Sequence, residues 1–270
     1  MSGEIWRLID TGPRDGASNM AIDEALLDCF DPEKSTPVLR LYGWSPPALS
    51  LGRFQDAGKV LDLARCKACG VPVVRRITGG GVIYHADELT YAIVCGLKHL
   101  PEKTTIKESF RFLTGFLLSF YREFGIPAVY AADVPGNMSR LGKPTPLCFA
   151  GRESYDIQAD GRKIGGNAQR RLRKAVFQHG SIPLRDRVET GIGFLRERPS
   201  GSDLSVADLS MLGVDVPEEV LKKRLASAFA GRIGGDLVPS EMTVAERERA
   251  ECLIHGKYAS GNRDRDGVEA

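Results

Sequence analysis

A cysteine and a lysine on the two sides of a hairpin signal could together carry out acyl transfer. Cys148 lies where a loop rich in Pro, Gly and Asn meets a strand-like run, and Lys163 follows the turn Asp160-Gly161. An Asp-Gly pair between two such runs is typical of a two-residue β-hairpin, which would bring Lys163 back toward residues 152–158. A nearby ammonium group stabilises a thiolate and can donate a hydrogen bond to a thioester carbonyl. From the residues alone, burial as a small apolar side chain is the commoner fate of such a cysteine.

A glycine-rich segment with two arginines is the second candidate for chemistry. Arg75 and Arg76 end one strand-like run, the glycines 79–81 follow, and His85 lies in the next run. Glycine allows backbone N–H groups to approach a ligand, and guanidinium groups suit carboxylate, phosphate or carbonyl oxygens. The segment matches neither the P-loop nor the dinucleotide fingerprint. A plain glycine-rich turn is the alternative, and His85 could contact a substrate or transfer a proton.

Three further features have a structural interpretation beside a functional one. His179 lies in a strand-like run and can simply satisfy nearby backbone groups. The basic cluster 170–174 could meet an acidic protein partner or form a solvated loop. Cys66 and Cys69 form a lone C-x-x-C, without the second ligand pair of a zinc site, so we interpret them as thiols near the end of a helix.

The elements that must position these residues are of both kinds. A helix is expected from Asn19 as N-cap to Phe30, and another over Val60–Cys69 ending at Gly70. The clearest helix follows Thr105, where Thr105 and Glu108 form a capping box and apolar residues recur every three or four positions to Phe124. Short strands are predicted over 38–42, 48–52, 71–75, 89–94 and 175–184, two more strands around the 160–161 turn, and helices over 218–230 and 243–255.

Composition sets ordinary limits. The chain has 270 residues with 37 basic and 35 acidic side chains, a net charge of +2 that indicates neither nucleic-acid binding nor membrane attachment. The first ten residues lack the basic start and apolar stretch of a signal peptide, and no run approaches a membrane span. Six cysteines in such a chain favour thiols over disulfides. We therefore expect a cytoplasmic protein.

Several ordered sequence blocks resemble the lipoate-protein ligase/octanoyltransferase family, which is related to biotin protein ligases. The resemblance extends from Trp6 to about Ser260. Within it, the cysteine octanoyltransferase branch (LipM type) is the most similar, because its nucleophile precedes an aromatic residue and an E-x-Y-like strand, as in residues 148–155. The blocks that carry the resemblance are residues 19–27, 39–44, 51–55, 75–85, 88–91, 161–169 and 179–182.

The resemblance implies an α+β fold, with a central mixed β-sheet flanked by helices and a small second sheet. The catalytic domain would cover residues 1–210. From the residue pattern itself we predict a helical portion packed on it over 211–258 and a polar, flexible tail over 259–270. Carried over by position, Cys148 is the nucleophile and Lys163 lowers the pKa of its thiol. The substrate would be bound by Arg75, Arg76, Gly79, Gly80, Gly81, His85 and Gly165.

The reaction implied is octanoyl transfer from acyl carrier protein to a lysine of a lipoyl domain, such as that of glycine-cleavage H protein, without any cofactor. Two positions depart from this pattern: Ala86 lies where the family often has Asp, and Gly81, where the branch tends to have Arg, makes a triple glycine that resembles the ATP-dependent ligases. The alternatives are therefore a lipoate-protein ligase that needs ATP and Mg²⁺, or an amidotransferase between lipoyl-domain proteins. A non-catalytic binder of acyl groups or lipoyl domains is a further hypothesis, under which Cys148 is never acylated.

Overall fold

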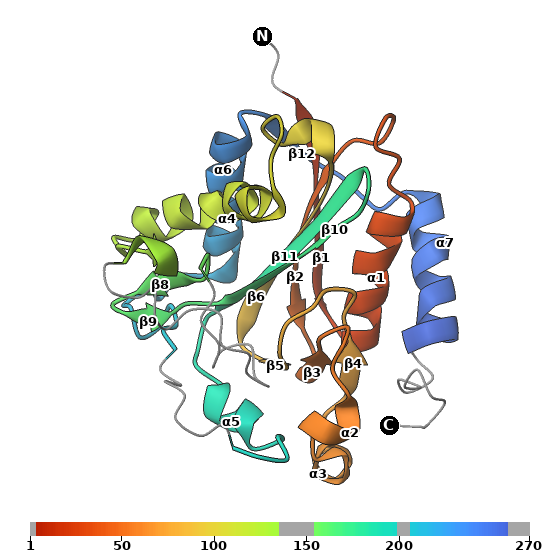
Figure 1. Cartoon of the computed structure of the whole chain (residues 1–270), viewed down its shortest axis with the longest axis vertical. Coiled ribbons are helices and arrows are strands. Elements are labelled where there is room, and N and C mark those ends of the chain that lie inside the picture. Colours follow the sequence, from red (N-terminus) through yellow and green to blue (C-terminus); the bar gives the residue numbers. More distant parts are fainter. Residues whose placement is uncertain (1–3, 135–153, 199–205, 259–270) are drawn as a thin grey trace.

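A six-stranded mixed sheet forms the centre of the molecule (Figure 1). The computed structural model describes residues 4–134, 154–198 and 206–258. β1 pairs in parallel with both β2 and β12, and the β2, β6, β11 and β10 pairings are antiparallel. In sheet order, the strands are β10 (Gly166–Arg171), β11 (Ala175–Pro183), β6 (Glu88–Gly96), β2 (Val38–Trp44), β1 (Ile5–Arg14) and β12 (Asp236–Pro239).

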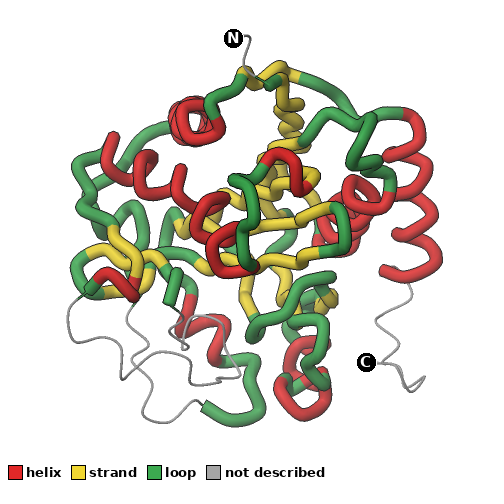
Figure 2. The backbone as a smooth tube through the Cα atoms, turned by 45° about the horizontal axis from the view of Figure 1, so that its top comes forward, coloured by secondary structure: helices red, strands yellow, loops and turns green. Residues whose placement is uncertain are grey.

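Four helices cover the two faces of this sheet, so the molecule has three layers (Figures 1 and 2). On one face, α4 (Ile106–Glu123) and α6 (Glu218–Ile233) pack together over a large apolar core. On the other, α1 (Gly16–Asp28) and α7 (Val244–Leu253) pack against each other over a second core. Since both faces of β6 and β11 meet helices, every residue of these two strands is buried.

Two small sheets flank the central one. The first contains β4 (Val73–Arg75), β3 (Ala48–Leu51) and β5 (Ile83–His85), and packs with the short helices α2 (Ala57–Val60), α3 (Leu63–Ala68) and α5 (Val188–Ile192). The second contains β7 (Val129–Tyr130), β8 (Ile157–Ala159) and β9 (Arg162–Lys163). The predicted α+β fold is confirmed, with two small sheets in place of the one that was expected.

The hairpin that carries Lys163 is confirmed. Asp160 and Gly161 have φ values of +50° and +72°, as the mirror-image turn of a two-residue hairpin requires. β8 and β9 pair across it, with Gln158 opposite Lys163. The carbonyl oxygen of Lys163 also accepts a hydrogen bond from the Ala207 N–H, so this short hairpin is tied to the chain beyond residue 205.

Several local predictions need correction. α1 begins four residues earlier than expected, because Asp15 rather than Asn19 caps it by accepting a hydrogen bond from the Ser18 N–H. The helix predicted over residues 60–69 is two short helices, each with its own aspartate cap. In α4 the capping box is confirmed, but Ile106 is 63% exposed, since the first turn extends past the core that it was expected to join.

The C-terminal portion is joined to the rest through both faces and one edge of the sheet. β12 extends the sheet beside β1, α6 packs on α4, and α7 packs on α1. The predicted boundary at residue 210 stays a prediction, and the predicted tail, residues 259–270, lies outside the described residues. None of the described helices is long and apolar enough to cross a bilayer.

We expect the aromatic contact between α6 and the sheet to be a main source of stability. Phe229 is fully buried, with its ring centroid 5.1 Å from that of Trp6 and 5.2 Å from that of Phe116. Replacing such a side chain by alanine removes apolar contacts and leaves a cavity, so Phe229→Ala should lower the free energy of unfolding by about 3–5 kcal/mol in urea titrations. Phe54, which is 76% exposed, provides the matched control. A similar loss in Phe54→Ala would contradict this assignment.

Candidate active site

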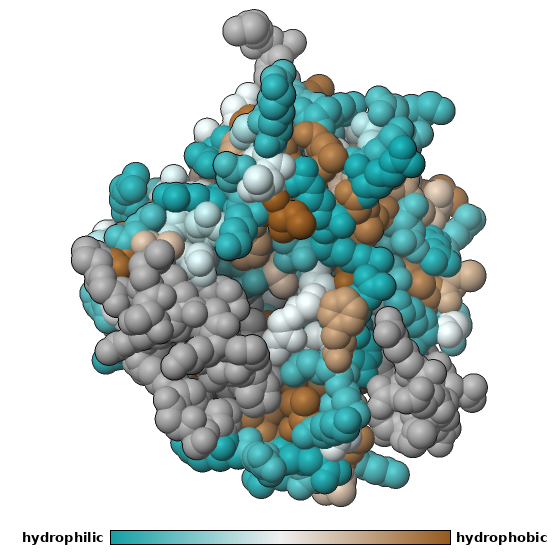
Figure 3. All heavy atoms as spheres, viewed as in Figure 1, coloured by the Kyte–Doolittle hydropathy of each residue, from teal (hydrophilic) through white to brown (hydrophobic). Residues whose placement is uncertain are grey.

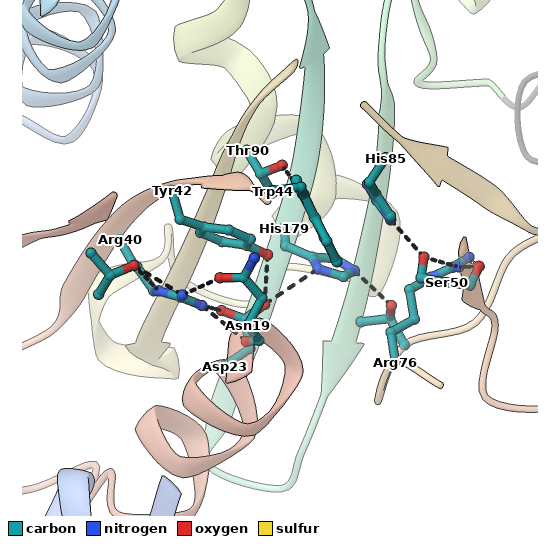
Figure 4. Close-up of polar contacts among 12 residues, drawn as sticks. Asn19, Asp23, Arg40, Tyr42, Trp44, Ser50, Arg76, His85, Thr90 and His179 are labelled. Carbon is teal, nitrogen blue, oxygen red and sulfur yellow. Dashed lines mark hydrogen bonds and ion pairs between the residues drawn. The ribbon is translucent and has the colours of Figure 1, made fainter. Parts of the chain in front are cut away.

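A cleft opens where the first small sheet meets β10 and β11 (Figure 4). It holds about 420 Å³ including its open mouth. Its walls combine apolar side chains with a few polar groups, as is usual for sites that bind small molecules. Met20, Trp44 and Ile83 supply apolar surface, and His85 and His179 supply imidazoles.

The Arg76 side chain links the glycine segment to the first small sheet through hydrogen bonds. Its side chain is almost completely buried, and its Nη1 donates to the Ser50 carbonyl oxygen at 2.9 Å and to Ser50 Oγ at 3.1 Å. Its Nη2 donates to the carbonyl oxygens of Gly79 and Gly81 at 2.9 and 2.7 Å. Hydrogen bonds from a charged donor are among the stronger ones in proteins, so this guanidinium fixes the shape of the loop.

Arg75 has a similar bracing role next to the cleft. Its Nη1 donates to the carbonyl oxygens of Gly52 and Gln55, which belong to the turn after β3. Both arginines were predicted to bind substrate. Arg76 and Gly80 do line the cleft, whereas Arg75 does not. Both guanidinium groups donate to carbonyl oxygens of the protein's own backbone.

Two glycines occupy positions that a side chain would disturb. Gly80, at the tip of the loop, has φ = +99°, which glycine adopts at little cost. Gly165 has φ = +77°, and a Cβ there would lie 2.1 Å from the Ser181 carbonyl oxygen. Gly165 thus allows the chain leaving Lys163 to pass close to β11 before Gly166 reaches the wall of the cleft.

His85 is held on both sides by hydrogen bonds. Its Nδ1 lies 2.7 Å from Glu88 Oε1, and its Nε2 lies 2.7 Å from Ser50 Oγ. The ring also stacks on Trp44, with 3.8 Å between centroids. With a proton on Nδ1 facing the Glu88 carboxylate, Nε2 can accept the hydroxyl proton of Ser50. His85 therefore lines the cleft, and its part in substrate binding or proton transfer stays a prediction.

A buried ionic network supports the far wall of the cleft (Figure 4). Asp23 on α1 accepts hydrogen bonds from Arg40 Nη1 at 2.6 Å and from the Tyr42 hydroxyl at 2.8 Å. Arg40 is fully buried and also donates to the carbonyl and side-chain oxygens of Asn19. Burial alone would raise the pKa of Asp23, but the Arg40 guanidinium and His179 outweigh it, so the pKa is lowered.

His179 connects this network to the glycine segment. Its Nε2 lies 2.7 Å from Thr78 Oγ1, and its Nδ1 lies 3.7 Å from Asp23 Oδ2. Burial lowers the pKa of His179 even though the Asp23 carboxylate acts in the opposite direction. The imidazole is therefore neutral at pH 7. Its contacts are with the side chains of Thr78 and Asp23, whereas the structural alternative expected contacts with nearby backbone groups.

Lys163 lies in a buried ion pair. Its Nζ is 2.8 Å from Asp156 Oδ2, and both side chains are about 95% buried. The carboxylate offsets the cost of burying the ammonium charge. Asp156 follows Cys148 by eight residues in the sequence, but Cys148 itself lies outside the described residues. The geometry of the predicted Cys148–Lys163 pair is therefore not described, and the roles of both residues stay predictions.

Sequence reasoning missed most of the polar framework around the cleft. Asn19, Asp23 and Arg40 occur in sequence blocks that carried the family resemblance, yet none of them was predicted to belong to the site. The contact of Asp156 with Lys163 could have been predicted, because the hairpin register places the two residues near each other. Among the described residues, no cluster of three His, Cys, Asp or Glu side chains is arranged to hold a metal ion.

The buried neutral imidazole should make stability depend on pH. An unfolded chain binds a proton at His179 near its ordinary pKa of 6.5, whereas the folded protein resists protonation to lower pH. Stability from this site is thus fully present above pH 6.5 and is lost as pH falls below it. We expect the free energy of unfolding to decrease between pH 7 and 5, and to decrease less in His179→Gln, as measured by urea titration. The exposed His255→Gln is the control, and equal slopes in wild type and His179→Gln would contradict the assignment.

Comparison with known proteins agrees with this architecture. Residues 15–230 match the family model described as the lipoyl protein ligase A/B catalytic domain. The chain is 36% identical over 265 residues to a protein of Kyrpidia tusciae named octanoyltransferase LipM, covering 94% of this chain and 96% of that one. Further curated relatives of the same name are 31–44% identical.

Solved structures of ligases have the same fold. A lipoate-protein ligase A crystallised with ATP superposes with a TM-score of 0.77 at 25% identity, over 96% of each chain. A bi-partite lipoate protein ligase of Thermoplasma acidophilum, studied with its E2 lipoyl domain, gives 0.75 at 23% identity over 96% of this chain and 94% of that one. The resemblance inferred from the sequence blocks is confirmed, and the chain belongs to the lipoyl protein ligase A/B catalytic-domain family.

Proposed function

We propose that this protein is an octanoyl-[acyl-carrier-protein]:protein N-octanoyltransferase. It would move octanoate from the thioester of an acyl carrier protein to a lysine of a lipoyl domain, such as that of glycine-cleavage H protein. The curated relatives named octanoyltransferase, which match 94–96% of the chain, are the observation that supports this reaction most directly. The cleft supports it as well, because its apolar walls suit an alkyl chain.

The proposed reaction is a double displacement through Cys148. Its thiolate attacks the thioester carbonyl carbon, the carbon–sulfur bond to the carrier breaks, and the carrier thiolate leaves and takes up a proton. The amine of the acceptor lysine then attacks the acyl-enzyme, the Cys148 sulfur leaves, and the amine loses a proton as the amide forms. Splitting the transfer in this way replaces one difficult step by two easier ones.

Lys163 would supply the positive charge that both steps require. A buried ammonium stabilises the Cys148 thiolate and can donate a hydrogen bond to the oxyanion of each tetrahedral intermediate. The ion pair with Asp156 supports this role, because it offsets the cost of burying the ammonium charge and limits the movement of the side chain. Backbone N–H groups of the glycine loop are further candidates for oxyanion donors, since Arg76 fixes their positions.

This chemistry needs no ATP, no metal ion and no other cofactor, and its partners are two proteins rather than a nucleic acid or a membrane. The alternative is the ATP-dependent ligase reaction. It is favoured by the likeness to a ligase crystallised with ATP and by the triple glycine. In a ligase, the same loop would hold an acyl-adenylate, and Cys148 would be dispensable.

Acylation of Cys148 distinguishes these reactions. After mixing with octanoyl-carrier protein without ATP, intact mass spectrometry should show one octanoyl adduct on the wild type and none on Cys148→Ser, because only a thiolate attacks the thioester fast enough to accumulate. Cys69→Ser and Cys252→Ser, which remove exposed thiols, should keep the adduct. An adduct on Cys148→Ser, or ATP-dependent lipoylation without any adduct, would refute the cysteine mechanism.

The role of Lys163 predicts a loss of rate with a changed pH dependence. Lys163→Met should slow acyl-enzyme formation by about 100-fold, comparable to removal of one oxyanion donor. The remaining rate should rise with pH toward the ordinary thiol pKa of about 8.5, because no ammonium then stabilises the thiolate. Rapid-quench measurement of the adduct between pH 6 and 9 tests this. A uniform loss with the wild-type pH profile would assign Lys163 a structural role only.

A further inference from the structure

The free end of the β10–β11 hairpin presents an unbalanced positive charge. Leu172 is 39% exposed, and Arg173 and Lys174 at the turn are also exposed. Arg171 differs from these neighbours, because its Nη1 donates to the Thr104 carbonyl oxygen at 2.8 Å. That hydrogen bond attaches the hairpin end to the segment that leads into α4.

The start of α4 continues this surface. Lys103 and Lys107 are exposed, and Ile106 between them has 63% of its surface accessible. Ser109 in the same turn donates to Gln169 Oε1 at 3.0 Å, which holds α4 against β10. We call the combined region the basic surface, and it consists of Lys103, Ile106, Lys107, Leu172, Arg173 and Lys174.

The cations of the basic surface have no ionic partners among the described residues. Its three lysines and its arginine form no ion pair and no side-chain hydrogen bond with any described residue. The carboxylates of the same segment are Glu102, which is exposed, and Glu108, which accepts the Thr105 N–H in the capping box. Four cations and two apolar side chains thus face solvent together, and Figure 3 shows hydrophilic side chains interspersed with hydrophobic ones on this face of the molecule.

The basic surface is joined to the cleft by a single strand. Gly166, Asn167 and Ala168 at the start of β10 line the cleft, and the same strand ends at Arg171. At about 3.3 Å per residue, the surface begins roughly 10 Å from the wall of the cleft. A partner bound there could reach the cleft with an extended arm while its own folded domain stays outside.

We propose that the basic surface is the docking site for the acyl carrier protein, which binds through an acidic face and the phosphate of its phosphopantetheine arm. This inference rests on the proposed octanoyltransferase function. The octanoyl donor carries a phosphate where the phosphopantetheine arm joins the carrier protein, and the thioester lies at the other end of this arm. Arginine and lysine are suited to phosphate and carboxylate groups. Ile106 and Leu172 supply the apolar centre that a transient interface requires.

The positive charges of the basic surface also disfavour binding of the acceptor, the lipoyl domain, at this surface. The acceptor presents a lysine, whose ammonium would approach a positive surface and be repelled. The basic surface should therefore act in the first half of the reaction and leave the second unaffected. This separation makes the proposal testable with donors that differ only in the carrier.

Charge reversal on both segments tests the docking site. We expect Lys107→Glu/Arg173→Glu to lower the second-order rate of acyl-enzyme formation from octanoyl-carrier protein by about tenfold or more, because electrostatic steering is lost. The rate from octanoyl-pantetheine, which has neither phosphate nor carrier domain, should not change. Raising the salt concentration should slow the wild type and have little effect on the variant.

The matched control is Arg122→Glu/Lys223→Glu, which reverses two exposed cations on α4 and α6 outside the basic surface. It should keep the wild-type rate with both donors. Equal loss with the carrier in both double variants, or equal loss with both donors in Lys107→Glu/Arg173→Glu, would overturn the docking site. A selective loss in transfer to the lipoyl domain would assign the surface to the acceptor and also overturn it. If the wild type forms no adduct with either donor, the octanoyltransferase function itself fails.

Discussion

The buried guanidinium of Arg76 is the constraint on which the cleft depends. It joins β3, through Ser50, to the carbonyl oxygens on both sides of Gly80. Three consecutive glycines would otherwise leave this loop with large conformational freedom. Because one charged group satisfies several acceptors at once, the loop has a single shape, and its backbone can serve as a fixed wall for the reacting end of a substrate.

Buried charges also fix the structure of the opposite wall of the cleft. Asp23 and Arg40 are both fully buried, and each charge is stabilised by the other. Hydrogen bonds with Tyr42 and Asn19 stabilise the pair further. Their network sets the position of His179, which in turn contacts Thr78 on the glycine segment. Polar contacts therefore link α1, β2, β11 and the glycine loop into one frame, while the apolar cores on the two faces of the central sheet supply most of the burial.

The sequence predicted local structure well where a local rule decides it. The capping box at Thr105 and the turn at Asp160-Gly161 depend on neighbouring residues only, and both were correct. The family blocks also identified the fold. Side-chain partners were harder to predict. Arg75 and Arg76 donate to backbone carbonyl oxygens, which no sequence spacing indicated, and their part in substrate binding stays a prediction. The network around Asp23 joins residues from four elements, and no sequence spacing encodes it.

The central claim is transfer of octanoate from a carrier thioester to a lipoyl domain without ATP, and a reconstituted reaction tests it most directly. The purified protein, octanoyl-carrier protein and a lipoyl domain are mixed without nucleotide, and the lipoyl domain is analysed by intact mass spectrometry. The account predicts one octanoyl group on its acceptor lysine. A lipoyl domain that stays unmodified under these conditions, but is acylated once ATP and free octanoate or lipoate are supplied, would contradict it.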